Sequence, residues 1–171
     1  MIELEKVLLK TIERLTTKSK YQWTHQGNCN CGHLIQSATG MGPEKIHNIA
    51  LTGPGEWVDH AKKYCKTSGL PVDDLISKLL SIGIKIDEIA HLEWLSDPNI
   101  IRYVPNSMKP LSYNKKEDLI YYLKTWNSIL SAKRLLRTDN SETVFINGIP
   151  YQQNFKSEIT LDENPSSGVA A

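Results

Sequence analysis

The chain has 171 residues, 40% of them hydrophobic and 23% charged, and its formal net charge is +1. This composition is that of a globular protein, neither disordered nor fibrous, and the longest apolar runs are far shorter than a membrane span. The N-terminus lacks the continuous apolar core of a signal peptide, and three cysteines do not suit a secreted disulfide framework, so we expect a cytoplasmic protein.

The first elements are predicted by helical periodicity. Apolar residues recur at helical spacing and predict an amphipathic helix over residues 2–17: Leu4, Leu8, Ile12 and Leu15. A polar stretch follows, which we expect to form a loop as far as Cys31. The sequence "CGHLIQSATG" then predicts a short helix with Asn30 as its N-cap and Gly40 as its end.

Prolines mark the expected starts of the next helices. A proline at the first helical position loses no hydrogen bond, and three segments fit this pattern, at Pro43, Pro54 and Pro71. Gly83 is expected to end the last of them. Asp87 is the predicted N-cap of a further helix, and Asp97-Pro98 is expected to begin a turn or a short helix.

The C-terminal part changes from helix to hairpin. Residues 115–137 predict the longest helix, with an apolar side formed by Leu119, Leu123, Trp126, Leu130 and the pair Leu135-Leu136. Asn147-Gly148 lies between two β-prone runs, which predicts a two-residue hairpin turn, and Pro150 indicates an edge strand. We therefore expect a mainly α single domain over 1–161, with about five to seven short helices, a hairpin at about 143–153 and a flexible tail over 162–171.

Charge is distributed unevenly along the chain. Residues 102–137 carry eight Lys and Arg but only two Asp and Glu. This excess would suit an anionic partner, but Lys133, Arg134 and Arg137 close a long helix, where cations interact favourably with the helix dipole. We favour a solvated helix, expect no nucleic-acid partner and no membrane association, and leave a homo-oligomer open.

The segment "WTHQGNCNCGH" (residues 23–33) holds two cysteines and two histidines. In extended backbone, Cys29, Cys31 and His33 share one face, as does His25, and Cys65 would complete a tetrahedral set suited to zinc. The predicted metal ligands are Cys29, Cys31, His33 and Cys65. The spacing differs from that of zinc knuckles, which separate paired cysteines by two to four residues.

Two further interpretations of this segment stay open. In the first, Cys31 lies in the first turn of a helix, where the dipole favours a thiolate, with His25 or His33 as base and Cys29 as a second thiol. Such a protein would be a thiol enzyme or a redox protein. In the second, both cysteines are buried as small hydrophobic residues in a compact turn of an interaction protein.

Two copies of the spacing E-x-x-H, Glu44 to His47 and Glu88 to His91, match the spacing found in di-iron helical bundles. The helices that carry them are expected to be short, and the spacing arises easily by chance. We therefore interpret both as surface pairs.

Three stretches, "YQWTHQGNCNCGHL", "YCKTSGLPVDDLISKLL" and "HLEWLSDP", together resemble an uncharacterised bacterial protein family with a W-x-H-x3-C-N-C-G-H-L segment. The resemblance covers most of the chain and implies a single cytoplasmic domain. It implies no catalytic or ligand residue and no activity.

Overall fold

The computed structural model describes residues 2–17, 19–53, 55–138 and 143–151, and these are mainly helical. The α-helices are α1 (Glu3–Thr17), α2 (Asn30–Thr39), α3 (Pro43–Ala50), α4 (Trp57–Lys63), α5 (Pro71–Ser81), α6 (Ile86–Trp94), α7 (Pro98–Ile101) and α8 (Lys116–Thr138). A 3-10 turn, η1 (Asn106–Met108), and a hairpin of β1 (Val144–Ile146) and β2 (Ile149–Tyr151) complete the described part. The predicted fold class is confirmed. The predicted tail over 162–171 lies outside the described residues.

Proline and aspartate begin several helices as predicted. Pro43 and Pro71 are the first residues of α3 and α5. The Asp97 carboxylate accepts the Asn99 N–H at 2.8 Å and so caps α7. Pro54 lies outside the described residues, and α4 begins three positions later, at Trp57.

Two predicted N-caps are wrong. Cys29, not Asn30, precedes α2, because the Asn30 side chain bonds to distant backbone rather than to its own helix. Lys85, not Asp87, precedes α6, and its N–H donates to the Glu88 carboxylate at 2.8 Å. In both cases the helix begins earlier than the predicted cap implied, α2 at Asn30 itself and α6 at Ile86.

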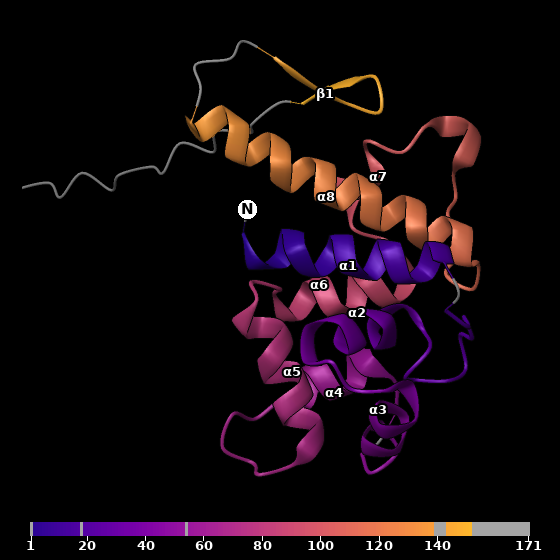
Figure 1. Ribbon diagram of the computed structural model, residues 1–171, viewed down its shortest axis with the longest axis vertical. Coiled ribbons are helices and arrows are strands. Elements are labelled where there is room, and N and C mark those ends of the chain that lie inside the picture. The colour runs from indigo at the N-terminus through magenta and orange to yellow at the C-terminus, as the bar shows by residue number, and fades with distance from the viewer. Residues whose placement is uncertain (1, 18, 54, 139–142, 152–171) are drawn as a thin grey trace, which may run out of the picture.

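The helices form two groups. α1 packs along α8, and Figure 1 shows the smaller helices α2 to α6 on the opposite side of α1. Within the group of smaller helices, α2 contacts α3, α5 and α6, and α4 contacts α6. α2 also contacts α1. The start of α2 is therefore enclosed by other helices, which places the cysteine segment inside the protein.

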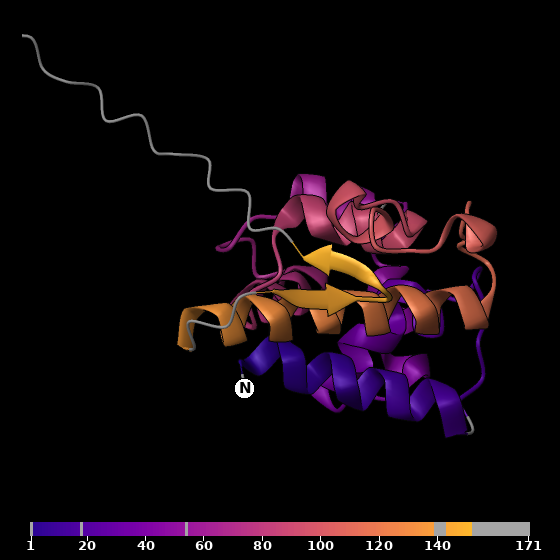
Figure 2. The same cartoon turned by 90° about the horizontal axis from the view of Figure 1, so that it is seen from above.

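The hairpin lies over α8 (Figure 2). Asn147 and Gly148 both have positive φ, 51° and 79°, as the predicted two-residue turn requires, and Ile146 pairs with Ile149 beside the turn. The Asn147 side-chain amide donates to the Tyr103 carbonyl at 3.0 Å and to the Thr125 hydroxyl at 3.1 Å. These two bonds fasten the turn to α8 and to the segment that follows α7.

The apolar faces are buried largely as their spacing predicts. Leu119, Leu123 and Trp126 are buried on α8, but Leu135 is 41% exposed, so the prediction is wrong for that leucine. Leu135 lies in the last turns of α8, whereas the buried residues Leu119, Leu123 and Trp126 lie in its first half. Across the described residues, no helix combines the length and the apolar character that a membrane span needs.

Candidate functional site

Asn30 organises the cysteine segment from the first position of α2. Its side chain is fully buried, and the amide nitrogen donates to the carbonyls of Leu92, Glu93 and Tyr113 at 2.9–3.3 Å. The Tyr21 hydroxyl donates to the Asn30 side-chain oxygen at 2.7 Å. Asn30 therefore holds the end of α6 and the approach to α8 against the start of α2.

The two cysteines of the segment are buried, and burial favours their neutral thiols. The Cys29 thiol donates to the Gln26 carbonyl at 3.3 Å, and the Cys31 thiol to the Ile89 carbonyl at 3.5 Å. Burial raises the pKa of Cys29 to about 12 and the pKa of Cys31 well above its ordinary value. Cys31 lies in the first turn of α2 as expected, and burial, the largest cause of its raised pKa, favours the neutral thiol there.

The other predicted ligands have other contacts. His33 is buried, with Nε2 3.1 Å from the Lys20 carbonyl, and burial lowers its pKa to about 4. Cys65 is exposed beyond the end of α4, where its neighbour is the Thr67 hydroxyl. Among the described residues, no three His, Cys, Asp or Glu side chains are arranged to hold a metal ion. The predicted zinc set does not fit this arrangement, and zinc binding stays a prediction from the sequence.

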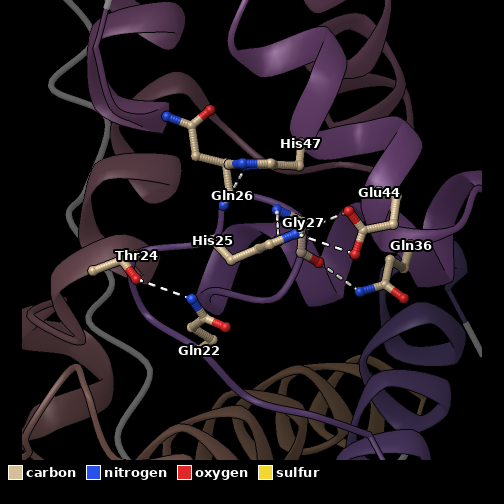
Figure 3. A network of polar contacts seen from close by, with 8 residues as sticks. All are labelled: Gln22, Thr24, His25, Gln26, Gly27, Gln36, Glu44 and His47. Atoms are coloured by element: carbon tan, nitrogen blue, oxygen red, sulfur yellow. Dashed lines mark hydrogen bonds and ion pairs between the residues drawn. The ribbon is translucent and has the colours of Figure 1, made fainter.

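His25 and His47 stack on one another, with ring centroids 4.0 Å apart (Figure 3). The His25 Nδ1 accepts the Gly27 N–H, and the His47 Nδ1 accepts the Gln26 N–H, both at 3.2 Å. Each neutral ring therefore carries its proton on Nε2. The His25 Nε2 faces Glu44, with its nearer carboxylate oxygen at 3.4 Å.

This pairing gives both nitrogens of His25 contacts within the protein. Its Nδ1 contacts the Gly27 N–H and its Nε2 the Glu44 carboxylate. The two rings are nearly parallel, 22° apart, and their in-plane lone pairs do not converge on one ion. The stacked histidines instead fasten the loop to α3.

Glycines allow the segment to fold this tightly. A Cβ on Gly27 would lie 2.0 Å from the Pro43 carbonyl oxygen, and one on Gly32 would lie 2.2 Å from the Gln26 carbonyl oxygen. Only glycine fits such an approach of backbone to backbone. The Gln36 side chain completes the contact by donating to the Gly27 carbonyl at 2.6 Å. These contacts support the interpretation of the segment as a compact turn.

A buried carboxylate close to the cysteines was not predicted. Glu93, on α6, is 1% exposed and accepts the Val58 N–H at 2.8 Å in the first turn of α4. Burial raises the pKa of its carboxyl to about 7. Periodicity alone gives no sign of this residue, since its partner lies 35 positions away.

A cleft of about 330 Å³ lies in another part of the molecule, between α8, the segment from Lys85 to Tyr103, and β2. Its floor is apolar and aromatic and consists of Ile100, Tyr103, Trp126, Ile129 and Tyr151, all buried. The rings of Tyr103 and Tyr151 lie side by side, with centroids 5.9 Å apart. The hairpin therefore supplies one side of this cleft.

Four cationic side chains surround this floor: Lys85, Arg102, Lys133 and Arg137. All four are exposed, and none forms an ion pair with a carboxylate in the part of the chain that the structure describes. Lys133 and Arg137 lie one turn apart on α8, so both face the same cleft. Among the described residues, the four cations of the cleft therefore have no carboxylate within ion-pair distance.

The cleft also contains two carboxylates, which are engaged elsewhere. Glu88 accepts the Lys85 N–H at the start of α6, and Asp97 accepts the Asn99 N–H at the start of α7. Burial raises the pKa of the Glu88 carboxyl. Each of these bonds uses one oxygen of the carboxylate and holds that side chain at its helix start.

The excess of positive charge over residues 102–137 was the sequence signal for this cleft. This stretch contributes Arg102, Lys133 and Arg137 to the lining, although from the sequence we favoured a solvated helix over an anionic partner. The fourth cation and the floor come from residues spread between 85 and 151, whose proximity only the fold establishes.

In comparisons with known proteins, no family model matches this chain, and no curated protein or solved structure was found that matches it. The resemblance to a bacterial family stays an expectation from the sequence.

Proposed function

We propose that the protein is a binding protein that takes a small anionic molecule into the cleft between α8 and the hairpin. The observation that carries the proposal is the set of four exposed cations, none paired with a described carboxylate, around one buried aromatic floor. In the same proposal, Cys29 and Cys31 serve the fold, as their burial and neutral thiols favour.

The physical basis is electrostatic. Like charges that gather in one concave site repel each other, and low-dielectric walls strengthen the field that an entering anion experiences. Small-molecule sites combine apolar and aromatic surface with charged groups that orient the ligand. Six of the twelve lining residues of this cleft are charged, more than is typical, and its volume of about 330 Å³ lies within the usual range. An anion would relieve the repulsion, and its uncharged part would cover the floor.

Binding is tested by NMR titration of the ¹⁵N-labelled protein with acetate, benzoate, inorganic phosphate and phenyl phosphate at low ionic strength. We expect shifts confined to amides around the cleft, and binding that weakens as salt is added. The double variant Lys133→Gln, Arg137→Gln should weaken binding about tenfold or more, a loss of about 1.4 kcal/mol.

Lys124→Gln is the matched control, because Lys124 is an exposed cation on the same helix but does not line the cleft. It should bind the probes like the unmodified protein. The proposal fails if no probe shifts the cleft amides, or if Lys124→Gln weakens binding as much as the double variant.

A further inference from the structure

Resting on the proposed function, the charges of the cleft define the class of ligand. Two cations, Lys133 and Arg137, come from α8, and the other two, Lys85 and Arg102, come from the segments that flank α6 and α7. Cations thus reach the cleft from two separate parts of the chain. A single anionic group of one charge would not balance both.

The formal charge of the lining indicates how many negative charges a ligand would need to neutralise it. Four cations and the carboxylates of Glu88 and Asp97 leave the lining with a formal charge of +2. Both carboxylates already accept backbone N–H bonds at helix starts, at 2.8 Å, so they are held in place rather than free to follow a ligand. A monoanion would leave one positive charge uncompensated, whereas a dianion would neutralise the lining.

We propose that the ligand is a small organic dianion, a phosphate monoester or a dicarboxylate, whose uncharged part is flat and apolar. Arginine supports this chemistry, because its planar fork of donors matches both phosphate and carboxylate oxygens. Arg102 and Arg137 both line the cleft.

The floor determines the uncharged part of the ligand. Tyr103, Trp126 and Tyr151 line the cleft and are 4%, 5% and 8% exposed, so a flat group would contact the small exposed part of these rings, in offset or edge-to-face contact. A second hollow of about 240 Å³, lined by Ile149 and Pro150, shares Arg102 and Tyr103 with the cleft. An organic group that extends from the anion therefore has apolar surface on which to lie.

Pairs of aromatic probes that differ by one negative charge test the charge of the ligand. Phenyl phosphate is a dianion above its second pKa of about 6, and benzenesulfonate has a similar shape but one negative charge. Phthalate and benzoate form the corresponding carboxylate pair. At about pH 8 and constant ionic strength, we expect each dianion to bind about tenfold more tightly than its monoanion, as measured by calorimetry and NMR.

Three further comparisons complete the test. Phenyl phosphate should bind more tightly than inorganic phosphate, because only the former covers the floor. Its affinity should fall as the pH decreases below about 6, where it becomes a monoanion. In the Lys133→Gln, Arg137→Gln variant, the preference for dianions should disappear, whereas in Lys124→Gln it should persist.

The outcomes separate the two proposals. If monoanions and dianions bind the cleft equally well, the dianion inference is wrong while the proposed function stands. If none of the probes perturbs the cleft, both are wrong. A preference for phthalate but not for phenyl phosphate, or the reverse, identifies which kind of dianion the cleft takes.

Discussion

The cysteine segment and the cleft differ in what their polar groups contact. In the segment, thiols, imidazoles and amides bond mainly to the protein's own backbone, as the Cys29 thiol does to Gln26 and Asn30 does to three carbonyls. In the cleft, four cations stand without a described carboxylate partner. The polar groups of the segment therefore have partners inside the protein, whereas the cations of the cleft have none among the described carboxylates, and the proposed function rests on this difference.

The largest expected effect concerns the thiols. Hydrogen bonds with Thr67 lower the pKa of Cys65, while burial raises the pKa of Cys29 to about 12. At about pH 8, iodoacetamide should label Cys65 at least about 1000-fold faster than Cys29 or Cys31, since only the thiolate reacts. Mass spectrometry of peptides measures the rates, and denatured protein, in which all three should react, is the control. Fast labelling of Cys31 in the folded protein would restore the thiol interpretation.

The next effect concerns the packing of the segment. Gly32→Ala places a Cβ 2.2 Å from a backbone oxygen, which the turn has no room to accept. We expect a loss of at least about 3 kcal/mol in the free energy of unfolding, measured by urea denaturation. Gly42→Ala is the control, because nothing lies within 4 Å of its Cβ, and it should cost at most about 1 kcal/mol as a helix-cap change. Similar losses in both variants would show that the segment is not tightly packed.

A third effect depends on pH. Burial raises the pKa of Glu93 from 4.5 to about 7, so the folded state holds this proton more tightly than the unfolded state. Stability from this group is therefore complete below about pH 4.5 and is lost as the pH rises to about 7, by about 3 kcal/mol at most.

Urea denaturation of Glu93→Gln across this pH range tests that expectation. The unmodified protein should lose stability relative to the variant as the pH rises, whereas Glu117→Gln, an exposed change on α8, should follow the unmodified protein. A constant difference between Glu93→Gln and the unmodified protein would contradict a proton held by burial.

The smallest effect belongs to the cleft. Lys133→Gln removes one of four like charges, so it should stabilise the protein slightly at low salt. We expect a gain of about 0.5 kcal/mol in the free energy of unfolding, seen as a small rise in the melting temperature. The gain should vanish as salt increases. Lys124→Gln, outside the cleft, should show no such gain, and a loss of stability in Lys133→Gln would indicate that Lys133 already has a favourable partner.

The sequence predicted the fold where local chemistry decides it. Pro71 begins a helix because its missing N–H is not needed there, and Asn147-Gly148 turns because both residues tolerate positive φ. Asn30 was misassigned because its side chain bonds to residues 62 to 83 positions away. Neither the burial of Cys31 nor the gathering of cations around Tyr103 follows from local sequence, because both depend on how distant helices pack.

The stacked histidines have a consequence for hydrogen exchange. The amide protons of Gln26 and Gly27 are donated to imidazole nitrogens rather than to carbonyl oxygens. Unlike a carbonyl oxygen, each of these acceptors belongs to a side chain, so a substitution can remove it without altering the backbone. The protection of each amide against exchange with solvent therefore depends on one imidazole ring, and His47→Ala should release the Gln26 amide whereas His25→Ala should release the Gly27 amide.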